Sequence, residues 1–158
     1  DFMLLDGLTV RENILVPRII QGNIDTKAAL LADQLTVLFG IDHIQNKYPA
    51  DISGGERQRT AVARSLVNNP LLILADEPTG NLDSKSSRTV IESFENAKKQ
   101  MNATILMVTH DSFSASFCDR VILLKDGIVY RELQRLGRRS AFHDQLLTAI
   151  KEMSGDEL

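Results

Sequence analysis

The feature that most constrains the fold is a pair of apolar runs separated by one helix length. Residues 71–75 read Leu-Leu-Ile-Leu-Ala, and residues 104–108 read Thr-Ile-Leu-Met-Val. Between them, a segment from about 85 to 100 carries apolar side chains at helical spacing. Continuous apolar strands joined by a helix are typical of a parallel sheet that is buried on both faces, with right-handed crossovers. The sequence after residue 70 therefore predicts an α/β fold.

The first 70 residues are helical in pattern instead. Thr9 and Glu12 have the spacing of a capping box, which predicts a helix over about 10–20. Asp25 is placed to cap a second helix, and Ser53 is placed to cap a third.

Two further elements are expected near the end of the chain. Asp126-Gly127 separates apolar segments at 120–124 and 128–132, which is a strong hairpin signal. A last helix is expected over about 141–153, capped by Ser140.

Composition limits the class of protein. Of 158 residues, 43% are hydrophobic and 25% are charged, as in a globular protein with a substantial core. The net charge of −3 gives no reason to expect nucleic acid or an anionic membrane surface as a partner. The apolar runs are too short to cross a bilayer. The chain opens on Asp1 without a basic signal region, so we expect an excised piece of a longer pattern.

Asp76 and Glu77 follow the first apolar run directly, and α/β folds place ligand sites at the carboxyl ends of strands. Adjacent carboxylates are costly to desolvate unless a cation or water stays near. Asp76 is therefore a candidate magnesium ligand, and Glu77 is a candidate general base. The alternative is that the pair is only a solvated acidic turn. The strand before the pair and the Pro-Thr-Gly after it favour the catalytic interpretation.

Ser53-Gly54-Gly55-Glu56 opens the third predicted helix. A capping box explains Ser53 and Glu56. It does not explain two glycines in the first turn, each of which costs roughly 1 kcal/mol of helix propensity relative to alanine. Bare backbone at the positive end of a helix can bind an anion, so this turn is a candidate phosphate site.

His110 follows the second apolar run and is placed to donate to a phosphate, although a single histidine there is often only a polar residue near a core. Asp83, taken alone, has the character of a helix cap.

Together, these motifs and their order resemble the nucleotide-binding domain of ABC transporters. The resemblance identifies residues 52–56 with the signature motif, 71–77 with the Walker B strand and catalytic glutamate, and His110 with the switch histidine. The D-loop corresponds to Asn81, Leu82 and Asp83. Ile52 and Glu56 stand where the family usually has Leu and Gln.

The resemblance implies a P-loop NTPase-like fold, in which residues 1–70 form the helical signature subdomain and residues 71–158 form the C-terminal part of the RecA-like core. It implies ATP and Mg²⁺ as ligands and a head-to-tail dimer, with Ser53, Gly54, Gly55 and Glu56 contacting ATP held by the second domain. Asp76, Glu77 and His110 would serve the ATP of their own chain.

No glycine in this sequence is followed by lysine, so the GxxxxGK[ST] phosphate loop of the family is absent from these 158 residues. We therefore expect a C-terminal fragment that lacks Walker A and does not hydrolyse ATP alone.

The resemblance to the antimicrobial-peptide (bacitracin-type) and lipoprotein-releasing subgroup implies a subunit that powers a separate membrane permease from the cytoplasmic face. A non-catalytic capping module and a soluble ABC ATPase acting on DNA or ribosomes are the alternatives.

Overall fold

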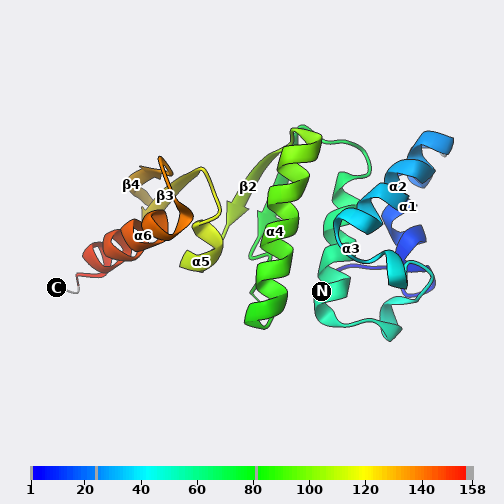
Figure 1. Ribbon diagram of the computed structural model, residues 1–158, viewed down its shortest axis with the longest axis horizontal. Helices are drawn as coiled ribbons and strands as arrows, with labels where there is room; N and C mark the ends of the chain where they lie inside the picture. The colour runs from blue at the N-terminus through cyan, green and yellow to red at the C-terminus, as the bar shows by residue number, and fades with distance from the viewer. Residues whose placement is uncertain (1, 24, 81, 156–158) are drawn as a thin grey trace. The chain divides into compact units, whose positions relative to one another are not determined.

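The computed structural model describes residues 2–23, 25–80 and 82–155, which divide into two compact units, Asp1–Leu106 and Met107–Leu158 (Figure 1). The first unit contains α1 (Val10–Ile20), α2 (Thr26–Leu38), the 3-10 turns η1 (Asp42–Ile44) and η2 (Pro49–Asp51), α3 (Gly54–Leu66), β1 (Leu72–Asp76) and α4 (Ser84–Met101). Strand β2 (Thr104–Val108) contains the boundary, and the second unit contains α5 (Ser112–Ala115), β3 (Arg120–Lys125), β4 (Ile128–Gln134) and α6 (Arg139–Ser154). Within the described ranges, no helix combines the length and apolar character that crossing a bilayer requires.

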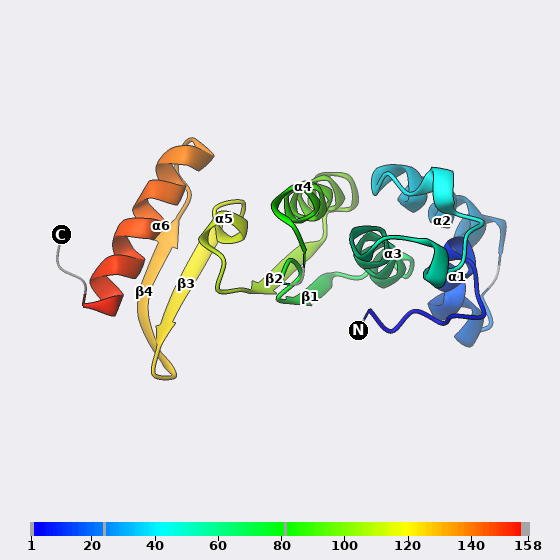
Figure 2. The same cartoon turned by 90° about the horizontal axis from the view of Figure 1, so that it is seen from below.

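Helices α1, α2 and α3 pack on one another and form the main core of the first unit (Figure 2). The expected helix starts at Thr9, Asp25 and Ser53 are confirmed, each with its side chain bonded to a first-turn amide. The largest buried apolar side chains of this core are Ile14, Leu35, Phe39, Ile41, Ile44 and Leu66. Burying each one stabilises the fold by about 1.5–3 kcal/mol.

A buried polar residue ties the segment before α1 to that helix. Asn13 is 0% exposed, and its Oδ1 accepts from the N–H of Leu5 over 2.8 Å. Its Nδ2 lies 3.0 Å from each of the carbonyl oxygens of Leu5, Leu8 and Thr9. The backbone over residues 5–9 is therefore fixed by one side chain.

Strands β1 and β2 pair in a parallel two-stranded sheet joined by α4, as the sequence predicted. The expectation that both faces are buried is wrong for the described residues. In β1, Ile73 and Ala75 are buried, whereas Leu72 and Leu74 are 51% and 72% exposed. The reason is that α4 lies along one side of this strand pair, and successive side chains of a strand point to opposite sides (Figures 1 and 2).

The second unit is an antiparallel hairpin with α6 packed on it. The predicted turn is confirmed: Asp126 and Gly127 have φ of 51° and 76°, the pair of positive values that a two-residue hairpin turn of type I′ needs. The predicted cap at Ser140 is wrong, since α6 begins at Arg139 with no side-chain cap. Arg139 instead stacks on the rings of Phe113 and Phe117, at 5.3 and 4.4 Å, which anchors the first turn by tertiary contact.

The elements before and after residue 70 are not separate in this architecture. Helix α4 packs on α2 and α3, so the helical part and the first strand belong to one compact unit. The division into family subdomains at residue 70 stays a prediction.

Candidate functional site

The amino end of α3 is closed by a complete capping box. Ser53 has extended backbone, and its Oγ accepts from the N–H of Glu56 over 3.3 Å. In return, Glu56 Oε2 accepts from the Ser53 N–H at 2.8 Å and from the Ser53 hydroxyl at 2.7 Å. Both side chains are therefore oriented by each other.

The charge of Glu56 is stabilised in this turn. Partial burial raises the pKa of Glu56, but the hydroxyl and N–H of Ser53 and the positive charges of Arg59 and His43 outweigh burial and hold the pKa below its ordinary value. The imidazole Nε2 of His43 lies 3.6 Å from Glu56 Oε1. The turn thus carries a fixed carboxylate at the start of a helix.

The two glycines of this turn have different surroundings. A Cβ at Gly54 would meet no atom within 4 Å, so nothing in the chain's own packing requires glycine there. A Cβ at Gly55 would lie 3.2 Å from both Cβ and Oγ of Ser86, closer than ordinary van der Waals contact. Packing against α4 therefore explains Gly55, whereas Gly54 leaves an open backbone that an external group can approach.

Asp76 and Glu77 lie at the carboxyl end of β1, as expected. Asp76 is the last residue of the strand and is exposed. Glu77 has φ of 42°, in the left-handed region that a residue with a side chain adopts rarely. Its carbonyl oxygen accepts from the N–H of Gly80 over 3.1 Å, which closes a tight turn. The chain therefore turns sharply at Glu77, directly after the strand ends.

The loop after this turn leads into α4. The N–H of Leu82 donates to the carbonyl of Thr79 over 3.1 Å, and Asp83 caps the helix by accepting from the amides of Lys85 and Ser86. The hydroxyl of Ser86 is the main cause that holds the pKa of Asp83 below its ordinary value, with the amides of Ser86 and Lys85 acting in the same direction. Asn81, the first residue of the expected D-loop, lies outside the described residues.

His110 belongs to the second unit, where it is exposed, so its expected position beside Asp76 and Glu77 stays a prediction. The next residue, Asp111, caps α5 by accepting from the N–H groups of Phe113 and Ser114. Burial raises the pKa of Asp111, but these bonds, the Ser114 hydroxyl and the charge of His110 together lower it.

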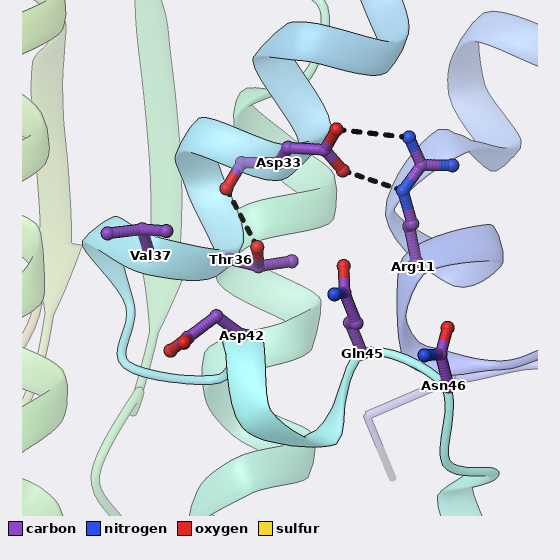
Figure 3. Close-up of a pocket in the computed structure, with 7 residues that line it drawn as sticks. All are labelled: Arg11, Asp33, Thr36, Val37, Asp42, Gln45 and Asn46. Carbon is purple, nitrogen blue, oxygen red and sulfur yellow. Dashed lines mark hydrogen bonds and ion pairs between the residues drawn. The ribbon is translucent and has the colours of Figure 1, made fainter.

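A pocket that the sequence did not indicate opens between α1, α2 and η1, and none of the expected site residues lines it (Figure 3). Its volume is about 480 Å³. On one side, Arg11 donates to both carboxylate oxygens of Asp33, at 2.6 and 3.3 Å. The remaining lining residues are Thr36, Val37, Asp42, Gln45 and Asn46.

The sequence analysis also did not single out Ser86, whose hydroxyl donates to the Asp83 carboxylate. Its place three residues after the Asp83 cap is a signal that could have indicated it.

The chain matches a known protein family over half of its length. A family model described as "ABC transporter" matches residues 1–80, which is half of the chain. The chain therefore belongs to the ABC transporter family.

The ABC ATPase fold, of the P-loop NTPase type, is confirmed by solved structures. A dimeric post-hydrolysis state of the ATP-binding cassette MJ0796 bound to ADP and Pi matches with a TM-score of 0.71 at 36% identity. The match covers 87% of this chain and 61% of that chain.

Relatives of known name confirm the expected subgroup. The ABC transporter ATP-binding protein YxdL of Bacillus subtilis is 42% identical over 99% of this chain and 61% of its own length. The bacitracin export ATP-binding protein BceA of Halalkalibacterium halodurans is 44% identical over 94% of this chain and 59% of its own. The lipoprotein-releasing system ATP-binding protein LolD of Idiomarina loihiensis is 41% identical over 82% and 57%. The chain thus spans about three fifths of the length of these relatives.

Proposed function

We propose that this chain is part of the ATP-binding and ATP-hydrolysing subunit of an ABC transporter, which powers a separate membrane permease from the cytoplasmic face. The observation that carries the proposal is the amino end of α3, where a complete cap coexists with an open backbone at Gly54. A helix start of this kind offers uncovered N–H groups and partial positive charge to an anion.

In the proposed complex, the turn of Ser53, Gly54, Gly55 and Glu56 binds the terminal phosphate of ATP that a second nucleotide-binding domain holds. The dimeric state of the solved MJ0796 cassette supports a paired arrangement. The open backbone at Gly54 lets the phosphate approach the first-turn amides without meeting a side chain. Binding at this turn therefore holds two domains together across one nucleotide.

Asp76 and Glu77 are proposed to serve the nucleotide of their own domain. No group of three His, Cys, Asp or Glu side chains in the described ranges forms a metal cage. The single exposed carboxylate of Asp76 fits Mg²⁺, which takes one or two carboxylates, keeps several waters and uses the phosphates of its substrate as further ligands. When bound, Mg²⁺ neutralises charge on the phosphates.

The other residues of the site act on water and phosphate. Glu77, which directly follows the last residue of β1, accepts the proton of the attacking water. His110 donates to the terminal phosphate. The resemblance assigns Asn81, Leu82 and Asp83 to the D-loop, and of these Asn81 lies outside the described residues.

The names of the relatives support transport rather than a capping role or a soluble function on DNA or ribosomes. One relative is named for bacitracin export and others for lipoprotein release. We take export of a peptide antibiotic as the substrate class, because the basic segment Arg138-Arg139 with Phe142 resembles that branch more than the other. No nucleic-acid partner is expected.

The test compares two proteins. The first is the 158-residue chain itself, which we expect to hydrolyse ATP only at background rate because these residues contain no glycine followed by lysine. The second joins this chain to the part of the BceA relative that it does not match, and we expect this chimera to hydrolyse ATP.

In the chimera, Glu77→Gln is expected to lower kcat by about a hundredfold or more, since removal of a general base typically costs this much. The matched control Glu92→Gln changes the same chemical group on the exposed side of α4 and leaves kcat unchanged. Turnover by the 158-residue chain that depends on Glu77, or a chimera whose turnover is indifferent to Glu77→Gln, overturns the proposal.

A further inference from the structure

The amino ends of α3 and α4 meet through one glycine and one serine. Gly55, in the first turn of α3, is buried, and a Cβ there would lie 3.2 Å from Cβ and 3.2 Å from Oγ of Ser86. Ser86 stands in the first turn of α4. Each helix therefore limits where the first turn of the other can lie.

Ser86 is itself held firmly. Its hydroxyl donates to Asp83 Oδ2 over 2.6 Å, and its N–H donates to Asp83 Oδ1 over 3.0 Å. Asp83 also accepts from the N–H of Lys85 over 3.0 Å, so three bonds orient this carboxylate. A displacement of the Ser86 side chain by α3 must therefore disturb the cap of α4.

The same cap is connected backward to the end of β1. The N–H of Leu82 donates to the carbonyl of Thr79, and the N–H of Gly80 donates to the carbonyl of Glu77, each over 3.1 Å. A Cβ at Gly80 would lie 3.5 Å from Cβ of Glu77, so this turn is compact as well. Short bonded steps thus lead from Glu77 to the Asp83 cap.

We propose that Ser86 is a positioning residue that holds the phosphate-binding turn of α3 in register with the turn at Glu77. The inference rests on the proposed function, because it joins the two halves that the function assigns to different nucleotides. Occupation of the Ser53–Glu56 turn, which is in contact with Ser86 through Gly55, is transmitted to the Asp83 cap and so to the backbone that carries Glu77.

The contact is tested first in the 158-residue chain by amide hydrogen exchange measured with NMR. Gly55→Ala introduces a Cβ against Ser86. The Ser87 N–H donates to the backbone carbonyl of Asp83, the residue that caps α4, and its exchange is expected to accelerate about fivefold, as loss of one hydrogen bond implies. Gly54→Ala is the matched control: its Cβ meets nothing within 4 Å, and α4 exchange stays at the wild-type rate.

A double-mutant cycle separates this contact from a general loss of stability. In a Ser86→Gly background, the nearest remaining neighbour of the new Cβ is Arg59 Nη1 at 3.6 Å, so Gly55→Ala is expected to add no further acceleration. In a Ser86→Ala background, the Cβ of residue 86 remains, and Gly55→Ala still accelerates exchange. Additive effects in both backgrounds, or equal effects of Gly54→Ala and Gly55→Ala on α4, overturn the proposed contact.

The functional arm uses the chimera with ATP. Ser86→Ala is expected to lower kcat about tenfold and to leave KM unchanged, because misplacement of a catalytic group by a fraction of an ångström acts on turnover rather than on binding. Thr89→Ala removes a hydroxyl from the same helix that donates to the carbonyl of Lys85 over 3.0 Å, and we expect both constants to stay unchanged. If the double-mutant cycle shows that Gly55 and Ser86 are coupled but Ser86→Ala leaves kcat unchanged, the positioning role is overturned. A wild-type chimera without ATPase activity overturns the proposed function instead and leaves the exchange result standing.

Discussion

The helices α1 and α3 begin with the same cap but differ in what the cap encloses. At both starts, a hydroxyl residue and a glutamate three positions later bond reciprocally: Thr9 with Glu12, and Ser53 with Glu56. The backbone N–H to Oε2 distance is 2.8 Å, the hydroxyl to Oε2 distance is 2.7 Å, and the glutamate N–H to hydroxyl distance is 3.3 Å in both boxes. The two caps are equivalent in geometry.

The residues between the capping pair separate the two starts. In α1, Val10 is 0% exposed, and Arg11 forms a bidentate ion pair with Asp33. In α3, a Cβ at Gly54 would meet no atom within 4 Å, whereas a Cβ at Gly55 would crowd Ser86. A helix start that serves only the fold uses its inner positions for packing and pairing. The start of α3 leaves one inner position open, and this difference is the physical basis for assigning it a ligand.

The largest effect is expected from adding a side chain at Gly54, where the backbone of the first turn is open. Gly54→Ala in the chimera is expected to lower ATPase activity about a hundredfold, because the methyl group blocks approach to the first-turn amides. The same change in the 158-residue chain is expected to raise the free energy of unfolding by about 0.5 kcal/mol, since alanine restricts the unfolded chain more than glycine does. Steady-state kinetics and urea unfolding give the two values. Activity within threefold of wild type contradicts the comparison.

The next effect tests whether the two caps are equivalent in energy as well. Thr9→Ala and Ser53→Ala are each expected to lower the free energy of unfolding by about 1 kcal/mol, because each removes the hydroxyl that caps a first-turn amide. Urea unfolding of both variants measures this. Thr148→Ala, which removes an exposed helical hydroxyl bonded to the carbonyl of Asp144, is the control and stays near wild type. A clear inequality between the two cap variants shows that the boxes are not interchangeable.

A smaller effect is expected from the ion pair between Arg11 in the first turn of α1 and Asp33. Asp33→Asn is expected to lower the free energy of unfolding by about 0.5 kcal/mol, because the carboxylate that Arg11 contacts is half exposed and screened by solvent. The loss should shrink as salt is raised, since screening already weakens the pair. Urea unfolding at low and high salt measures it. A loss that is independent of salt shows that hydrogen bonding rather than charge holds the pair.

The smallest effect is a shared pH dependence of the two caps. The N–H and hydroxyl of Thr9 hold the pKa of Glu12 below about 4.5, the ordinary value, against slight burial, and Glu56 is lowered in the same direction. A lowered folded pKa means that the charged form is stabilised by folding, so this stability is complete above about pH 4.5 and is lost as pH falls through the folded pKa. Thermal unfolding between neutral and acidic pH measures the decline. Glu12→Gln should flatten it, with Glu92→Gln as the control that does not.

Much of the helical fold could be predicted because its signals are local. Thr9, Asp25 and Ser53 each mark a helix start through bonds to amides within the next three residues, and such bonds need no tertiary context. Asp126-Gly127 is local in the same sense, because positive φ at both positions forms the turn. The failure at Ser140 has the opposite cause. The first turn of α6 is held by Arg139 on two aromatic rings from an earlier segment, which no local pattern indicates.

The candidate site was predicted in its residue types more than in its contacts. The capping role of Ser53 and Glu56 follows from spacing, and so does the position of Asp76 at a strand end. The different surroundings of the two glycines could not be predicted, because Ser86 reaches Gly55 only after α3 and α4 have packed. The exposure of Leu72 and Leu74 could not be predicted either, because an apolar sequence does not indicate whether one face of a strand or both faces are covered.

Asn13 limits how the chain can vary. Its amide accepts one backbone N–H and approaches three backbone carbonyls while remaining 0% exposed. Aspartate at this position keeps the shape but puts negative charge against carbonyl oxygens, and leucine keeps the volume but leaves those backbone groups without partners. Glutamine has the right chemistry on a stem that is one methylene too long. Position 13 is thus intolerant of every close substitute, and a library of random variants should return asparagine there whether the screen selects for folding or for function.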